Sequence, residues 1–109
     1  MSRTKGNLAE DKACKFLYEN GYTVVERNFY SRFGEIDIIA SKDDVLHFIE
    51  VKSGLDYESA IQNITYKKLL RVIRTADIYL KKNSLDIDIV YDAIIVTPQG
   101  VDMVENITI

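Results

Sequence analysis

The sequence lacks any run of about 18 or more apolar residues, and residues 1–6 lead into alternating charged residues. Neither a membrane-spanning helix nor an export signal is therefore expected, and we expect a cytoplasmic protein without a membrane partner. The chain has one cysteine, Cys14, so no internal disulfide can form, and no group of Cys and His residues has zinc spacing. A reducing compartment is the simplest expectation.

Positive charge is also in deficit, because 14 Lys and Arg stand against 17 Asp and Glu, a net charge of -3 at pH 7. A protein that coats nucleic acid through bulk charge needs clustered cations, so the balance argues against that class. It still permits a local basic face. A length of 109 residues fits one domain, residues 1–109, with one hydrophobic core.

Capping and turn signals divide the chain into helices and strands. Asn7 and Glu10 have the spacing of a capping box, Gly21 supplies a helix stop, and Asp56 can cap a second helix. The order α-β-β-β-α-β-β predicts an α/β fold with a central sheet flanked by helices. The expected elements are a helix over 7–20, strands over 23–29, 35–40 and 45–52, a long helix over 57–82, and strands over 87–97 and 101–109.

Three charged residues on two consecutive predicted strands suit metal chemistry: Asp37 on one, Glu50 and Lys52 on the next. Side chains alternate between the faces of a strand, so Glu50 and Lys52 share a face. A two-residue turn at 43–44 places Asp37 directly opposite Glu50, and a four-residue turn makes them diagonal neighbours. A three-residue turn separates them. The parity of the turn therefore decides whether the site exists.

Two carboxylates this close on an apolar face repel each other unless a cation lies between them. Mg²⁺ or Mn²⁺ would suit, since a hard divalent ion accepts carboxylate oxygens, water and phosphate together. Lys52 would orient the attacking water or stabilise charge on the phosphorus oxygens. The predicted chemistry is phosphodiester hydrolysis, with Asp37 and Glu50 as metal ligands. Spacing alone leaves open an ordinary solvated face with a cross-strand ion pair.

The residues around this Asp-x₁₂-Glu-x-Lys pattern are more specific than the pattern itself. Asn-Phe-Tyr-Ser-Arg-Phe-Gly-Glu-Ile-Asp-Ile-Ile-Ala at 28–40 and Phe-Ile-Glu-Val-Lys at 48–52 resemble the YraN-like family, which is similar to Holliday-junction resolvases of the PD-(D/E)xK nuclease superfamily. The resemblance covers nearly the whole chain. It implies an αβββαβ restriction-endonuclease-like core with a mixed sheet. It also implies a nuclease-type site in which Glu10 and Lys52 are catalytic beside Asp37 and Glu50.

The chain departs from the family pattern in three ways. Gly54 stands where the family has a basic residue, the loop over 53–59 is shorter, and the chain is acidic where members tend to be basic. Glu10 also has a second interpretation, since a capping box satisfies helix amides without any catalysis. His47 alternates away from the proposed site and is expected to be structural.

A basic stripe runs along the predicted long helix, where five cations fall within about 60° of one direction. A solvated outer face is one interpretation of this stripe. The other is that Lys67, Arg71 and Arg74 bind nucleic-acid phosphates, with Lys67 nearest the metal site. The cations are Lys67, Arg71, Arg74, Lys81 and Lys82.

Two functions agree with these features. The first is a metal-dependent nuclease for branched, flapped or single-stranded nucleic acid, with DNA expected over RNA, and a homodimer would suit a two-fold symmetric resolvase-like fold. The second is a catalytically inactive module of the same fold that binds nucleic acid or a protein partner.

Overall fold

One five-stranded sheet forms the centre of the molecule, and its strands follow the order β1-β2-β3-β4-β5. The computed structural model describes the backbone of residues 5–108 and the side chains of residues 8–108. Only β3 and β4 run parallel, so the sheet is mixed and the predicted α/β fold is confirmed. The elements are α1 (Lys5–Glu19), β1 (Thr23–Ser31), β2 (Gly34–Lys42), β3 (Val45–Ser53), α2 (Tyr57–Ile61), α3 (Tyr66–Lys82), β4 (Asp88–Thr97) and β5 (Gly100–Val104).

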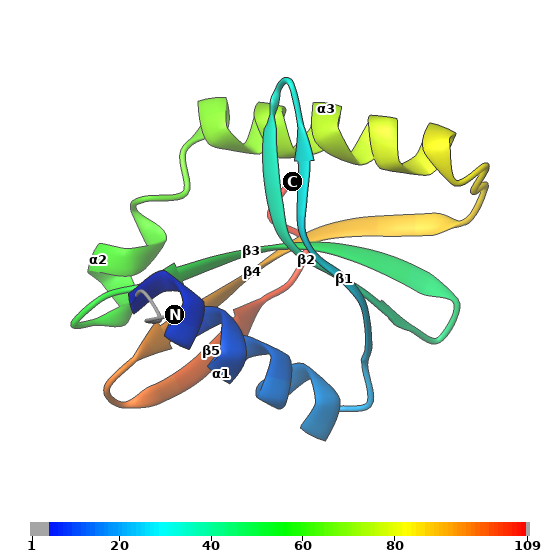
Figure 1. The fold of residues 1–109 in the computed structure, drawn as a ribbon. Coiled ribbons are helices and arrows are strands. Elements are labelled where there is room, and N and C mark those ends of the chain that lie inside the picture. Colours follow the sequence, from blue (N-terminus) through cyan, green and yellow to red (C-terminus); the bar gives the residue numbers. More distant parts are fainter. Residues whose placement is uncertain (1–4, 109) are drawn as a thin grey trace.

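Helices α1 and α3 cover opposite faces of the sheet, and α2 lies at one end of it (Figure 1). Buried Ala13 and Leu17 of α1 belong to one core cluster, together with Ile49 of β3. Val72 and Ala76 of α3 belong to the cluster on the other face. A parallel strand pair needs a long crossover, and α2 and α3 provide it between β3 and β4.

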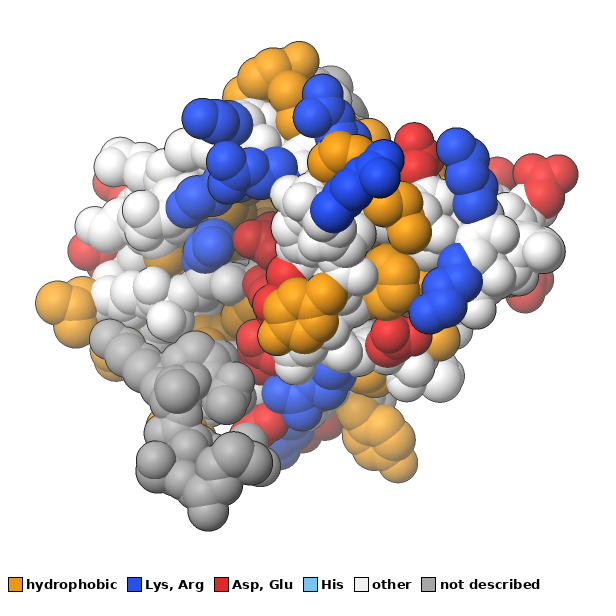
Figure 2. Space-filling model, turned by 45° about the horizontal axis from the view of Figure 1, so that its top comes forward, with side chains coloured by type: hydrophobic (Ala, Val, Ile, Leu, Met, Phe, Trp, Pro, Cys, Tyr) orange, Lys and Arg blue, Asp and Glu red, His pale blue; other side chains and the backbone are white. Residues whose placement is uncertain are grey.

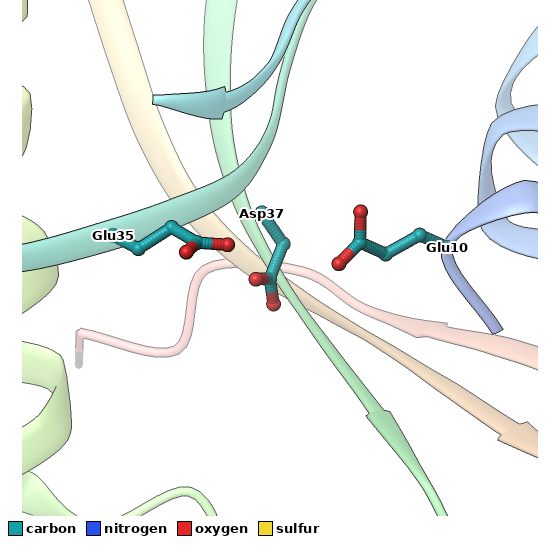
Figure 3. A group of neighbouring side chains, drawn as sticks. All are labelled: Glu10, Glu35 and Asp37. Atoms are coloured by element: carbon teal, nitrogen blue, oxygen red, sulfur yellow. The ribbon is translucent and has the colours of Figure 1, made fainter. Parts of the chain in front are cut away.

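Helix α1 ends as predicted but begins earlier than predicted. Gly21 has a φ of 86°, and the amide of Tyr22 donates to the carbonyl of Leu17 at 2.9 Å, which closes the helix. The helix begins at Lys5, so Asn7 lies inside it and cannot be its N-cap. The capping-box prediction is therefore wrong, and the carboxylate of Glu10 is directed to the sheet instead (Figure 3).

The predicted continuous helix over 57–82 is also wrong, because two helices occupy this segment. Asp56 caps α2 by accepting from the amide of Ser59 at 2.8 Å. Thr65 caps α3 by accepting from the amide of Lys68 at 3.2 Å. A threonine hydroxyl can accept a hydrogen bond from a backbone amide and so begin a helix. The apolar periodicity of residues 57–82 continues past Thr65, and for that reason it did not reveal this boundary.

The last strand is shorter than predicted, since β5 ends at Val104. The following segment is tied to β4 by two backbone donors. The amide of Asn106 donates to Asp92 Oδ1 at 2.8 Å, and the amide of Ile107 donates to the carbonyl of Tyr91 at 2.8 Å. Ile109, the last residue of the predicted strand, lies outside the described residues.

Between β2 and β3 lies the two-residue turn on which the site prediction depends. Lys42 pairs with Val45, and both Asp43 and Asp44 have positive φ, at 52° and 64°. Such a turn matches the right-handed twist of the flanking strands. The even parity of the turn is confirmed.

Strand β2 parts from β3 at Asp37. The β2–β3 pairing runs from Lys42 to Ile38 and no further, whereas the β1–β2 pairing continues to Ser31 and Gly34. Beyond this point the β1–β2 hairpin rises over α3 (Figure 1). Ser31 Oγ lies 2.8 Å from Thr75 Oγ1, which ties the hairpin to that helix. Beyond Ile49, the edge of β3 is no longer paired with β2, so side chains can bind its backbone.

Among residues 5–108, no helix combines the length and the apolar character needed to cross a membrane.

Candidate metal and phosphate site

Four carboxylates gather where β2 and β3 diverge. Glu10 comes from α1, Glu35 and Asp37 from β2, and Glu50 from β3. Oxygens of Glu10, Glu35 and Asp37 lie within 4.8 Å of one another, and Figure 3 shows Glu10 and Glu35 extending toward Asp37 from opposite sides. The charge of Glu50 acts on Asp37 from the neighbouring strand. The structure thus brings the predicted Asp37, Glu50 and Glu10 together.

Asp37 is the most strongly perturbed of these carboxylates. Its Oδ2 accepts the amide of Val51 at 2.8 Å, so the side chain binds a β3 amide at the point where the β2–β3 ladder ends. Burial above all, and then the charge of Glu50, raise the pKa of Asp37 from 3.8 to about 7, against the opposing effect of the Val51 amide. Near neutral pH this carboxyl is partly protonated unless a cation compensates its charge.

Glu35 is a member of the cluster that the sequence analysis did not single out. It is half-buried, and burial raises its pKa, while the Tyr30 hydroxyl lowers the pKa and the charge of Asp37 raises it. A signal for it existed in the sequence. Glu35 and Asp37 are two residues apart in one strand, and that spacing places both side chains on one face.

Two β1 residues position Glu10 and Glu35. Glu10 is buried, and its Oε1 lies 3.5 Å from Arg27 Nη2, which also lies 3.0 Å from Asp11 Oδ1. With its amide nitrogen facing the carboxylates, Asn28 donates to Glu10 Oε1 at 3.2 Å and to Glu35 Oε1 at 2.9 Å. Asn28 has a φ of 55°, a left-handed conformation that asparagine tolerates better than most residues. Asn28 therefore sets the spacing of two carboxylates on different elements.

Lys52 stands beside the carboxylates, as the strand alternation predicts. Its Nζ lies 3.4 Å from Glu50 Oε2. Both residues line an open pocket of about 320 Å³ together with cations from α3. The lining residues are Gly34, Glu35, Asp37, Glu50, Lys52, Lys68, Arg71 and Val72. Oxygen donors and ammonium and guanidinium groups face one space, which suits a cation bound together with a phosphate.

Known sequences place this chain in a family. A sequence model of the uncharacterised protein family UPF0102 matches residues 9–96. The chain belongs to UPF0102, the YraN family. The resemblance noted in the sequence is thereby confirmed, and Glu10, Asp37, Glu50 and Lys52 all fall within the matched residues of this UPF0102 member.

Three relatives in this family match along all or nearly all of their length. A UPF0102 protein of Sulfurimonas denitrificans is 65% identical over 109 residues, 100% of both chains. One from Aliarcobacter butzleri is 50% identical over 109 residues, 99% of each chain. One from Helicobacter hepaticus is 47% identical over 108 residues, which covers 99% of this chain and 97% of the relative. Their names state the family and no activity.

The cations of α3 that reach the pocket of this UPF0102 protein are Lys68 and Arg71. Lys67, predicted to lie nearest the metal site, is exposed and does not line the pocket. Lys68 precedes Arg71 by three residues and Val72 by four, so these three share the side of α3 that lines the pocket. Lys67 is close in direction to Arg71 but about 100° from Lys68 and farther still from Val72, so it lies at the outer margin of that side. Arg74 reaches the hairpin, with its guanidinium 5.7 Å from the centre of the Phe33 ring.

Figure 2 shows the resulting charge pattern on one face of the molecule. Acidic side chains occupy a hollow, and a group of basic side chains lies along one side of it. Arg32, on the hairpin, also lies over the Phe33 ring, at 4.9 Å. Arg32 of the hairpin and Arg74 of α3 thus both lie at Phe33, and Lys68 and Arg71 of α3 line the carboxylate pocket, although the chain as a whole is acidic.

His47 is structural, as expected from its place in β3. Its Nδ1 lies 2.5 Å from Oδ2 of Asp92, which is fully buried. Tyr22 packs edge-on against the His47 ring, with centroids 5.0 Å apart. Asp92, to which the sequence analysis gave no role, joins β3, β4 and the segment at Asn106.

Proposed function

We propose that this protein binds Mg²⁺ or Mn²⁺ at the carboxylate cluster and hydrolyses phosphodiesters in structured nucleic acid, with DNA as the expected substrate. The observation that carries the proposal is a cluster in which carboxylate oxygens of Glu10, Glu35 and Asp37 lie within 4.8 Å of one another. Glu35 and Asp37 of this cluster line the pocket that Lys52, Lys68 and Arg71 also line. The family resemblance supports it, since it implies a nuclease-type site at Glu10, Asp37, Glu50 and Lys52.

The donor set fits a hard divalent cation. All the donors are carboxylate oxygens, the ligands that Mg²⁺ and Mn²⁺ prefer, and no His or Cys belongs to the described group. The raised pKa of Asp37 supports the same conclusion, because a cation would compensate the charge of a partly buried carboxylate that lies next to Glu50. Asp37, Glu35 and Glu50 would hold the ion, and Glu10 would complete the set from α1.

The residues of the chain have separable roles in this proposal. A bound cation would polarise the scissile phosphate and lower the pKa of its water. Lys52 stabilises negative charge that develops on the phosphate oxygens, from a position fixed by Glu50. Lys68 and Arg71 hold the phosphates that flank the scissile bond. Asn28 and Arg27 keep Glu10 and Glu35 in place.

A cleavage panel tests this function. Duplex, flap, four-way junction and single-stranded DNA are incubated with protein in Mg²⁺ and in Mn²⁺. Asp37→Asn and Lys52→Ala should each lower the rate about 100-fold or more, because each removes a group that acts on the reacting phosphate. Asp102→Asn is the matched control, since Asp102 is an exposed acid of β5 that does not line the pocket.

Calorimetric titration with Mn²⁺ runs beside the panel. Heat of binding that is lost in Asp37→Asn and kept in Asp102→Asn supports the metal site. Equal cleavage by wild type and Asp37→Asn would indicate a contaminating nuclease and contradict the proposal. Absence of both Mn²⁺ heat and cleavage would favour the inactive module that binds nucleic acid or a protein partner.

A further inference from the structure

Tyr30 is a large aromatic side chain left exposed at the edge of the carboxylate cluster. It is 70% exposed, although it lies in β1 within the sheet. It pairs across the hairpin with Glu35, a member of the cluster, and the Glu35 carboxylate raises the pKa of the Tyr30 hydroxyl. The residue is therefore held next to the cluster by strand pairing while its ring remains open to solvent.

The neighbours of Tyr30 explain why its ring is not part of the core. Phe29 is buried and packs edge-on against Tyr79 of α3, with centroids 5.1 Å apart. Ser31 contacts Thr75 of the same helix. Because side chains alternate along a strand, Tyr30 points to the opposite side, the side on which Asn28 bonds Glu10 and Glu35. With 70% of its surface exposed, the ring has a face open to a ligand.

Resting on the proposed function, we infer that Tyr30 is a stacking platform for an unpaired nucleobase next to the phosphate bound at the carboxylate cluster. The substrate class is thereby narrowed to nucleic acid with a single-stranded segment at the point of cleavage. A base inside a duplex is already stacked on both faces, whereas an unpaired base can leave its neighbours and lie on an aromatic ring.

The remaining groups of the pocket agree with this assignment. Lys68 and Arg71 line the pocket from α3, and Tyr30 of β1 lies outside the lining, as the cross-strand neighbour of the lining residue Glu35. The Lys and Arg side chains bind the phosphate backbone of a nucleic acid of any sequence. Stacking on an aromatic ring tolerates any base, because each base has a π face. Together they select an unpaired strand without selecting its sequence.

Strand binding in Ca²⁺ tests the inference, with fluorescence anisotropy as the readout. The probes are two dye-labelled DNA strands of equal length, one with all bases and one with abasic sites at its central positions. Tyr30→Ala should weaken binding of the first strand about tenfold and leave the second unchanged. Tyr30→Phe should bind both strands as wild type does, because it keeps the ring. Tyr18→Ala is the control, since Tyr18 is 81% exposed on α1.

Two results would overturn the inference. One is a wild-type protein that binds both strands equally, and the other is a Tyr30→Ala variant whose affinity for the two strands changes by the same factor. Unchanged thermal unfolding of Tyr30→Ala shows that the fold is intact. The readout needs no cleavage, so the two proposals fail separately. If the protein cleaves DNA but its binding does not depend on the bases, only the stacking role of Tyr30 is excluded. If its binding depends on the bases but it shows neither Mn²⁺ heat nor cleavage, only the nuclease activity is excluded.

Discussion

At the scale of single residues, Asp37 combines a structural and a chemical role. It accepts the amide of Val51, which the β2–β3 ladder no longer pairs, and it stands between Glu35 and Glu50. The first role stabilises the edge of β3. The second opposes folding above neutral pH, because an ionised Asp37 is partly buried beside other negative charges.

The raised pKa of Asp37 means that Asp37→Asn can test whether the ionised carboxylate destabilises the folded protein. In the folded protein the pKa of Asp37 is about 7, against 3.8 for the ordinary value, so the folded state binds more protons between these pH values. The contribution of Asp37 to the free energy of unfolding therefore falls as the pH rises from about 4 to 7. Without metal, Asp37→Asn should be more stable than wild type at pH 8, by at most about 4 kcal/mol, and the gain should shrink at pH 5.

Urea unfolding at pH 5 and pH 8 measures this difference, and Asn retains an oxygen for the Val51 amide. Saturating Mg²⁺ should stabilise wild type and leave Asp37→Asn unchanged, since only an ionised ligand set binds the ion. A variant that is less stable than wild type at pH 8 would show that Asp37 is not penalised by burial and Glu50.

At the scale of elements, the site depends on two strands that separate and on a helix that starts late. The β1–β2 hairpin leaves β3 at Asp37, and its tip is held to α3 by Thr75. Gly34 has a φ of 153°, and a Cβ added there would lie 3.4 Å from Cβ of Arg71, so the hairpin approaches the helix closely. The start of α3 at Tyr66 sets which cations face the pocket.

Replacing the cap of α3 tests that helix boundary. Thr65→Ala removes the acceptor for the Lys68 amide and should lower the free energy of unfolding by about 1 kcal/mol. Thr65→Ser keeps a hydroxyl and should restore most of the loss. Chemical unfolding of the three proteins gives the comparison. Equal stability of Thr65→Ala and wild type would indicate that residue 65 does not begin a helix.

At the scale of the whole molecule, the arrangement of charge matters more than its total. The net charge is -3, yet Lys68 and Arg71 line one side of the carboxylate pocket, and Arg32 and Arg74 flank Phe33. Long-range attraction of nucleic acid is weak in an acidic protein, so binding must depend on a few close phosphate contacts.

Salt dependence reports those contacts one by one. A plot of log affinity for single-stranded DNA against log salt should have a slope that is shallower by about 0.7 in Arg71→Ala, because one phosphate contact is lost. Lys81→Ala, in the last turn of α3 and outside the pocket lining, should keep the wild-type slope. Equal slopes for wild type and Arg71→Ala would exclude Arg71 from phosphate binding.

Local rules sufficed for the strand pair at the centre of the site. The alternation of side chains places Glu50 and Lys52 on one face, and a two-residue turn with positive φ sets a register that carries Asp37 toward Glu50, although the β2–β3 pairing ends one residue earlier, at Ile38. Both depend on neighbouring residues alone, so the sequence by itself determined them. The same rules failed at Asn7 and across Thr65, where capping and apolar patterns admit more than one helix boundary.

Only the tertiary structure decided how the cluster is completed. Glu10 on α1 and Asn28 on β1 meet Glu35 because the helix packs against the sheet and the hairpin leaves β3. Lys68 lines the pocket in place of the predicted Lys67 because of the way α3 is rotated about its axis where it packs against β2. These placements are set by packing between segments far apart in the chain, and no local periodicity carries that information.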